Sequence, residues 1–185
     1  MLKRILIIIA ALLVIFVGYV AYLFLTTRNH SPQDIAAIEQ GTFAAEVVYC
    51  QPFKKGRTIF GPEGEALVPF GMKWRTGANE ATMLKLNEKV SFGGKELAPG
   101  RYSLYTIPNA GEWVVAINSR VDYWGAGMSD PFQEEFDVIR VKAPAQQLDS
   151  VAEQFHIRWG TPNDSTFTLK LLWDQTWVQV PVTRL

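Results

Sequence analysis

A run of 21 residues without a charge, from Ile5 to Leu25, constrains this chain more than any other feature of its sequence. At about 1.5 Å of rise per residue, a helix of that length spans about 31 Å, the thickness of a bilayer hydrocarbon core. Inside lipid, backbone polar groups must be paired within the segment. Tyr19 and Tyr22 lie toward the far end of the run, where aromatic side chains favour the membrane interface. The run therefore predicts a transmembrane helix.

Three processing fates are open to an apolar segment at this position. A cleaved signal peptide carries an apolar core of about 7–15 residues followed by an Ala-x-Ala-like site. Here the run is longer, and the sequence TTRNH at 26–30 offers no such site. A lipoprotein needs its cysteine directly after the run, whereas Cys50 lies far downstream. We therefore expect an uncleaved signal anchor.

The flanking charges predict which side of the membrane the rest of the chain occupies. Lys3 and Arg4 precede the apolar run, and Arg28 follows it. Because positively charged flanks stay in the cytoplasm, we expect the amino terminus inside and the remainder outside, on the periplasmic side of an inner membrane. The predicted divisions are a cytoplasmic tip with the transmembrane helix at 1–28, a juxtamembrane linker at 29–41 and a folded domain at 42–185.

Composition excludes several classes of protein. Lysine and arginine total 18 and aspartate and glutamate total 18, so the chain lacks the basic excess of a nucleic-acid binder. One cysteine permits neither an intrachain disulfide nor a multi-cysteine zinc site, and two histidines leave little material for other metals. We predict no metal and no cofactor. The sequence also lacks GxxxxGK[ST], HExxH, GxSxG and GxGxxG.

Alternating apolar residues dominate the exposed part of the chain. In the clearest case Phe167, Leu169 and Leu171 take one side of a strand. Gly-Gly, Pro-Gly and Pro-Asn-Ala-Gly turns separate such segments. Short strands at this spacing predict an all-β fold, an antiparallel β-sandwich of jelly-roll or immunoglobulin-like type with eight or nine strands. The expected strands are 42–50, 81–86, 89–92, 101–108, 112–118, 136–141, 153–159, 166–173 and 176–182.

Two segments depart from the strand pattern. Ser31 and Pro32 resemble the start of a helix, Ile35 and Ile38 share a face, and Gly41 is a suitable end, so we predict a short juxtamembrane helix. Residues 51–81 are rich in glycine, proline and charge. A loop this long in a compact domain is usually functional or internally packed.

Several blocks in and after this loop are specific. They read YCQPFKKGR at 49–57, IFG at 59–61, LVPFG at 67–71, WRTGANEAT at 74–82 and APGRYSL at 98–104. They resemble the DUF2911 family, a group of bacterial envelope-associated proteins of unassigned function, over about 43–182. The resemblance implies a β-sandwich and an exported location, and it implies no reaction. Many relatives have an ordinary export signal where this chain has its apolar run.

The WRTGANE block at 74–80 holds the best candidate site. Arg75 offers a planar fork of donors, Glu80 an acceptor or general base, and Trp74 a stacking wall. Neighbouring basic residues favour an anionic ligand such as a carboxylate, a phosphate or an acidic sugar. Alternatively, Arg75 pairs with Glu80 and locks the loop onto the sandwich, with Trp74 in the core. The candidate ligand-binding residues are Trp74, Arg75, Asn79, Glu80, Lys54 and Arg57.

Four other features have a structural interpretation beside a functional one. His156 is expected to be a solvated strand residue, and Cys50 a buried and inert one. The DYWG sequence at 122–125 fits either a sugar-binding platform or a packed loop tip. The sequence NDS at 163–165 matches a glycosylation sequon, which is common by chance.

These observations favour a membrane-anchored, non-enzymatic module that binds a small anionic or sugar ligand or an envelope protein partner. A second hypothesis is a hydrolase of glycans or phosphoesters, with Glu80 as general base and Arg75 as electrostatic stabiliser. It requires Glu80, Asp122 and His156 to lie within hydrogen-bond range. A third is a purely structural domain of an envelope complex, which predicts a large exposed apolar patch.

Overall fold

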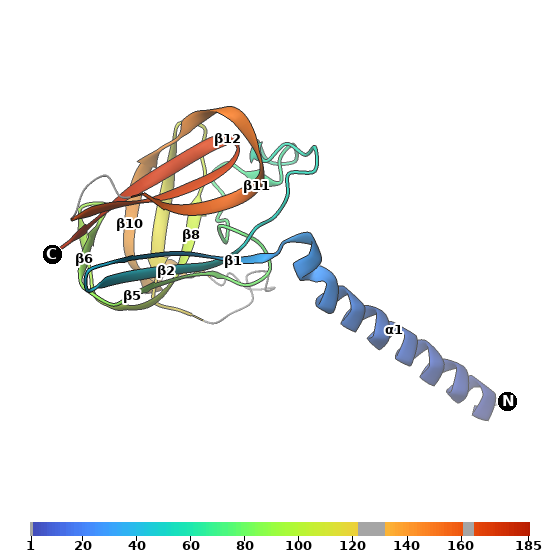
Figure 1. Ribbon diagram of the computed structural model, residues 1–185. Helices are drawn as coiled ribbons and strands as arrows, with labels where there is room; N and C mark the ends of the chain where they lie inside the picture. The colour runs from blue at the N-terminus through green and yellow to red at the C-terminus, as the bar shows by residue number, and fades with distance from the viewer. Residues whose placement is uncertain (1, 122–131, 161–164) are drawn as a thin grey trace.

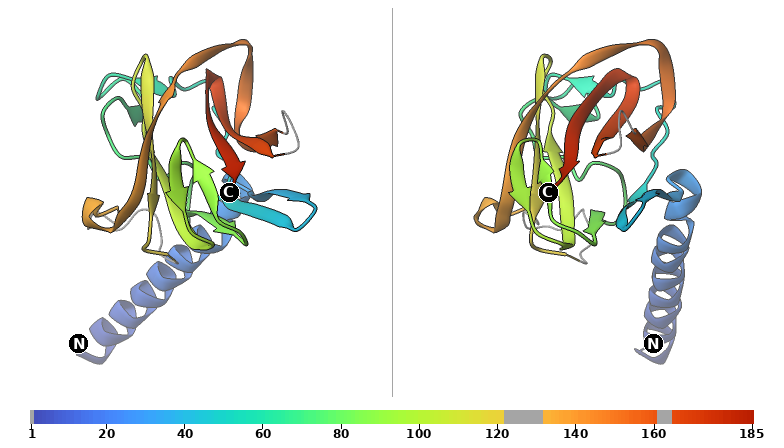
Figure 2. Two further views of the ribbon diagram at one scale, coloured as in Figure 1. Left: turned by 90° about the vertical axis from the view of Figure 1, so that its left-hand side faces the viewer. Right: turned by 60° about the vertical axis from the view of Figure 1, so that its left-hand side comes forward.

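A single long helix, α1 (Leu2–His30), precedes the strands and projects away from them in every view (Figures 1 and 2). The computed structural model describes residues 2–121, 132–160 and 165–185. Within these residues α1 is the one helix long and apolar enough to cross a membrane, and its apolar part is not buried against the strands. The predicted apolar helix is therefore present, and it continues past Leu25 to His30. A membrane anchor and a signal sequence share these properties.

Two antiparallel sheets follow α1. The larger has the order β1-β2-β5-β8-β9-β10, and the smaller has the order β11-β12-β6-β7. The larger sheet contains β1 (Gln33–Gln40), β2 (Phe43–Cys50), β5 (Thr82–Leu86), β8 (Gly100–Ile107), β9 (Glu112–Asn118) and β10 (Asp137–Pro144). The smaller contains β6 (Val90–Phe92), β7 (Lys95–Leu97), β11 (Gln146–Gly160) and β12 (Thr166–Arg184). The predicted antiparallel sandwich is confirmed, with more strands than expected.

The core lies between the two sheets. Alternate residues of β12, including Phe167, Leu169 and Leu171, are fully buried, as the sequence pattern predicts. Phe43 and Val47 of β2 are buried from the opposite sheet. Burying a side chain of this size contributes about 1.5–3 kcal/mol, so these alternating positions supply much of the stability that holds the sheets together.

Residues 33–40 form the strand β1, so the predicted short juxtamembrane helix is wrong. β1 pairs with β2 along its whole length, from Gln33 opposite Cys50 to Gln40 opposite Phe43. Gly41 has φ of 62° and belongs to the turn between these two strands. A helix of about ten residues is marginal in isolation, whereas pairing with β2 satisfies the backbone of β1 without nucleation. Helical spacing of the two isoleucines did not reveal this long-range pairing.

Other elements differ in extent from the predicted ones. The expected strands 166–173 and 176–182 are one strand, β12, in which Asp174 has φ of 54° and the register to β11 shifts. A 3₁₀ helix, η1 (Glu134–Phe136), lies just before β10. The 51–81 segment is mostly irregular, with two short parallel strands, β3 (Phe60–Gly61) and β4 (Val68–Pro69).

Candidate functional site

Trp74 fixes the 74–80 loop to the larger sheet. Its backbone N–H donates to the carbonyl of Thr106 at 2.7 Å and its carbonyl accepts from the Thr106 N–H at 2.9 Å. The indole is 8% exposed, and its Nε1 donates to the Gly77 carbonyl at 3.1 Å. It packs against Trp173, stacked at 5.7 Å between ring centroids, and against Phe155 at 5.0 Å. The indole thus belongs to the core and anchors the loop.

The loop bends through backbone conformations that few residues adopt. Thr76 and Asn79 have φ of 55° and 58°, and Gly77 has φ of 154°. A Cβ on Gly77 would lie 2.9 Å from the Cys50 carbonyl oxygen, so only glycine allows the loop to approach β2 this closely. Thr82 donates from Oγ1 to the Thr76 carbonyl at 2.7 Å. The loop is therefore held in one shape, which sets the direction of Arg75 and Asn79.

A cavity of about 380 Å³ lies where this loop meets the end of α1. We call it the helix-end cavity. Its walls combine aromatic rings, polar groups from the end of α1 and basic side chains from two loops. The lining residues are His30, Ser31, Pro52, Lys55, Arg57, Leu67, Val68, Trp74, Arg75, Gly77, Ala78, Asn79 and Trp173. Three of them are lysine or arginine, and none of these described lining residues is acidic.

None of the three cationic side chains forms an ion pair with a carboxylate among the described residues, although the Lys55 backbone N–H donates to Glu153 Oε1 at 2.8 Å. Arg75 donates from Nη1 to the Asn79 carbonyl at 3.2 Å, and burial lowers the pKa of its guanidinium. Arg57 donates from its guanidinium to backbone carbonyls of its own loop. The Lys55 Nζ lies 3.5 Å from Nδ1 of His30. Lys55 and Arg57 are exposed and Arg75 is half-buried, and like charges gathered around one cavity favour an anion between them.

Two of the candidate residues lie outside this cavity. Lys54 forms an ion pair with Asp174, with 2.5 Å between Nζ and Oδ1. Glu80 pairs with Arg28 of α1 at 2.7 Å and accepts from the thiol of Cys50 at 3.4 Å. Burial opposes ionisation of Glu80, but the hydrogen bonds from Arg28, its own backbone and Cys50 outweigh burial, so its pKa lies below the ordinary value. Trp74, Arg75, Asn79 and Arg57 are brought together, whereas Lys54 and Glu80 are not among them.

The alternative in which Arg75 pairs with Glu80 is not the arrangement found. Instead the loop is joined to the end of α1 and to Ser31, the residue that follows it. Glu80 binds Arg28, and Asn79 donates from Nδ2 to the Ser31 carbonyl at 3.3 Å. Sequence reasoning treated Arg28 as a flanking charge and missed the contribution of α1. The sequence signal that could have pointed to this contact is Arg28 itself, an arginine within three residues of the end of the apolar run.

His156 belongs to a separate polar cluster. Its Nδ1 lies 3.0 Å from Nε2 of Gln51, which also donates to Asp34 at 2.9 Å and to the Tyr49 hydroxyl at 3.0 Å. Burial lowers the pKa of His156, with a further lowering from Arg158. The residue is half-buried and hydrogen-bonded rather than solvated.

Three of the remaining sequence features do not add to the candidate site. Cys50 is buried, as expected, and burial raises the pKa of its thiol. The DYWG sequence at 122–125 lies outside the described residues, and so do 163 and 164 of the sequon. The triad proposed for a hydrolase is therefore described only at Glu80 and His156, and these two have different hydrogen-bond partners.

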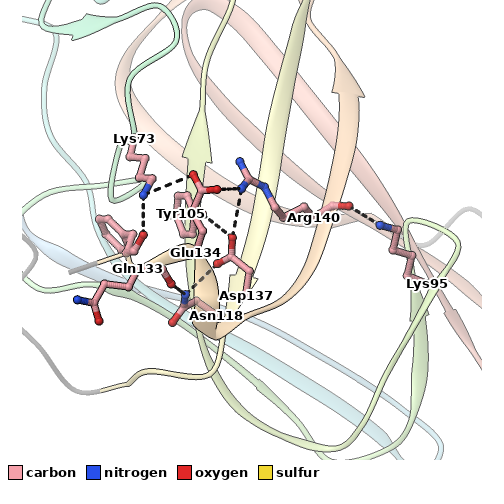
Figure 3. A network of polar contacts seen from close by, with 9 residues as sticks. Lys73, Lys95, Tyr105, Asn118, Gln133, Glu134, Asp137 and Arg140 are labelled. Atoms are coloured by element: carbon pink, nitrogen blue, oxygen red, sulfur yellow. Dashed lines mark hydrogen bonds and ion pairs between the residues drawn. The ribbon is translucent and has the colours of Figure 1, made fainter. Parts of the chain in front are cut away.

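A second charged cluster lies beside η1, on the larger sheet (Figure 3). We call it the η1 network. Asp137, whose side chain is 5% exposed, accepts from the Tyr105 hydroxyl at 2.7 Å and from Asn118 at 2.8 Å. Glu134 pairs with Arg140 at 2.6 Å and with Lys73 at 3.6 Å. Burial, the hydrogen bond to Asp137 and its charge raise the pKa of Tyr105. Opposite charges meet throughout, so this network fastens η1 to the sheet.

Other cavities lack the uniform charge of the helix-end cavity. A cavity of about 270 Å³ beside Cys50 is lined by both acidic and basic residues, including Glu46, Glu80 and Lys85. One of about 460 Å³ near the start of β11 is lined mainly by polar amides with Asp174. Within the described residues, no group of three or more His, Cys, Asp or Glu side chains is placed to hold a metal ion.

The comparisons with known proteins identify a family and nothing more specific. Residues 31–182 match the model of a family described as a protein of unknown function, DUF2911. No curated protein and no solved structure matches the chain. The match begins at Ser31, the residue after α1, and includes both sheets and the 74–80 loop. Because it extends over most of the sequence, the chain belongs to the DUF2911 family.

Proposed function

We propose that this chain is a single-pass membrane protein whose β-sandwich binds a small anionic ligand, a phosphate, carboxylate or acidic sugar, in the helix-end cavity. One observation carries the proposal. Lys55, Arg57 and Arg75 line one cavity, and none of their cationic side chains forms an ion pair with a carboxylate among the described residues; the one carboxylate contact is from the Lys55 backbone N–H to Glu153. Assembling like charges without a ligand costs free energy, so an arrangement of this kind is more often a binding site than a structural device.

The other cavity walls suit an organic anion. Trp74 and Trp173 line the cavity but are only 8% and 1% exposed, so the exposed Leu67 supplies most of the apolar surface on which a sugar or hydrocarbon packs. Arg75 keeps most of its guanidinium donors free after its bond to the Asn79 carbonyl, among the contacts described, and this fork binds two oxygens of a carboxylate or phosphate at once. A volume of about 380 Å³ falls in the range typical of small-molecule sites.

The same cavity supports retention of α1 as an anchor. His30 and Ser31 form part of its wall, and Arg28 and the Ser31 carbonyl hold the 74–80 loop. Cleavage after the apolar run would leave these residues on a frayed terminus. The excess of basic residues before the apolar run supports a cytoplasmic amino terminus and a sandwich outside the cytoplasm.

The hydrolase alternative has less support. A general base at neutral pH works best with a pKa near that pH. The pKa of Glu80 lies below its ordinary value, and both of its oxygens are engaged, by Arg28 and by Cys50.

Thermal unfolding of the full-length protein in a neutral detergent tests anion binding. Inorganic phosphate should raise Tm relative to sodium chloride of equal ionic strength. Arg75→Gln should abolish this rise while keeping Tm in chloride, since the glutamine amide still reaches toward the Asn79 carbonyl. Arg158→Gln is the matched control, because Arg158 is exposed on β11 and does not line the cavity. Equal phosphate responses in wild type and Arg75→Gln would contradict the proposal.

A further inference from the structure

We propose that the anion in the helix-end cavity is presented by the membrane itself, as the phosphate of an anionic lipid headgroup. This inference rests on the proposed function, since it names the source of the ligand for the same cavity. It follows from where α1 places that cavity relative to the bilayer.

The height of the cavity above the hydrocarbon core follows from the length of α1. The apolar run ends at Leu25 and α1 continues without a break to His30, which lines the cavity. Five residues of helix rise about 7.5 Å. The headgroup layer of one leaflet is about 5–7.5 Å thick, and tilt of the helix lowers His30 further. The α1 wall of the cavity therefore lies at the level of the lipid phosphates.

The cavity is held at that height. Ser31 donates its N–H to the Thr27 carbonyl at 3.2 Å, which continues the helical hydrogen bonding to the end of α1. The ion pair between Arg28 and Glu80 and the bond from Asn79 to Ser31 then join the 74–80 loop to the same helical turn. With no flexible linker between the helix and the loop, the cations cannot move far from the headgroup layer.

The apolar part of the lining favours a lipid over a free inorganic ion. Leu67 lines the cavity and is 46% exposed, whereas the two tryptophans of the lining are 8% and 1% exposed, so Leu67 supplies most of the apolar surface. A bare phosphate gains nothing from such surface, whereas the glycerol and upper acyl carbons of a lipid bury against it. Lysine and arginine near an anionic bilayer surface are also attracted to it, which brings Lys55 and Arg57 to the headgroups.

Nanodiscs of two compositions test the inference with the full-length chain. One contains phosphatidylcholine alone and the other contains equal amounts of phosphatidylcholine and phosphatidylglycerol. Native mass spectrometry of protein released from the mixed discs measures which lipid is retained, and thermal unfolding measures the effect on Tm. We expect several-fold enrichment of phosphatidylglycerol over the disc composition and a higher Tm in the mixed discs.

The variants distinguish binding in the cavity from general attraction of the lipid to surface charge. Arg75→Gln and, independently, the exposed Lys55→Gln should each reduce the enrichment several-fold, whereas Arg158→Gln should retain it. Lys55→Gln keeps the test valid if Arg75→Gln fails to fold in phosphatidylcholine discs. Equal enrichment in all variants would overturn the inference, because the lipid would then respond to charge in general.

The outcomes also separate this inference from the proposed function. If phosphate raises Tm in detergent but phosphatidylglycerol is not enriched, the lipid source is wrong and anion binding stands. If enrichment depends on Arg75 and Lys55 while free phosphate has no effect, the lipid source is supported and binding of free anions fails. If neither probe binds, both proposals fail.

Discussion

Two clusters of charged residues in this molecule differ in whether their charges are paired. In the η1 network every carboxylate meets a cation or a hydrogen-bond donor, and Asp137 is almost completely buried (Figure 3). In the helix-end cavity, three cations face a shared space without an acidic neighbour among the lining residues. The first arrangement stabilises the fold, and the second leaves charge available. Paired charge therefore marks structure here, and unpaired charge of one sign marks the candidate site.

The largest effect is expected in the η1 network. Asp137→Ala leaves the Tyr105 hydroxyl and the Asn118 amide without this buried acceptor, and it should lower the free energy of unfolding by about 3 kcal/mol. Denaturation followed by tryptophan fluorescence measures this loss. Glu134→Gln, at a side chain 53% exposed, is the control and should lower the free energy of unfolding far less than Asp137→Ala does. Equal costs for the two variants would break the contrast between the clusters.

Gly77→Ala should have the next largest effect, because it disturbs the loop that shapes the cavity. The new Cβ meets the Cys50 carbonyl at 2.9 Å and the backbone has φ of 154°, so we expect a loss of about 1–3 kcal/mol and a weakened phosphate response. Gly111→Ala is a matched control, since nothing lies within 4 Å of its added Cβ and its φ is not in the positive region. A full phosphate response in Gly77→Ala would show that loop shape does not govern binding.

The tie between α1 and the loop predicts a smaller effect that depends on pH. Although burial opposes it, the hydrogen bond from Arg28 helps hold the pKa of Glu80 below its ordinary value. The pair therefore stabilises the fold above the ordinary carboxyl pKa of about 4.3, and this contribution is lost as pH falls through the folded-state pKa. Arg28→Gln should lower stability only slightly at pH 7, and its difference from wild type should vanish near pH 3. A difference that persists in acid would point to packing instead.

The smallest expected effect has the opposite sign. Lys55→Gln removes one of three like charges, so at low salt it should leave stability unchanged or raise it by about 0.2–0.5 kcal/mol. The same change should weaken the phosphate response. Unfolding at 20 mM and 500 mM salt measures both, because screening should erase the gain. Clear destabilisation would mean that Lys55 is structural, and that the cavity resembles the η1 network after all.

The sequence predicted what depends on local pattern and missed what depends on distant pairing. Alternation placed Phe167 and Leu169 in the core and gave most strands of both sheets. The spacing of Ile35 and Ile38 predicts a helix where β1 lies, because a local pattern carries no information on the pairing of β1 with β2. The helix prediction is wrong because helical spacing over a few residues is a weak preference, whereas pairing with β2 at eight positions stabilises the strand strongly.

The candidate site was predicted in part for the same reason. Arg75, Asn79 and Arg57 lie in or near one loop, so proximity in sequence placed them together. The same reasoning wrongly grouped Lys54 with them. Its side chain pairs with Asp174 because of the local backbone direction, which neighbouring residue types do not reveal. His30 was missed because it lies more than 40 residues from the 74–80 loop and contributes only through the fold.

The direct passage from α1 into β1 has a mechanical consequence. Helix and strand are separated only by Ser31 and Pro32, and β1 is hydrogen-bonded to β2 along all eight of its residues. If α1 is embedded in a surface, any tilt or rotation of the helix also rotates the larger sheet, because no flexible segment separates the two. The sandwich therefore has a fixed orientation relative to the surface that holds α1. A molecule that arrives from that surface always meets the same face of the sandwich.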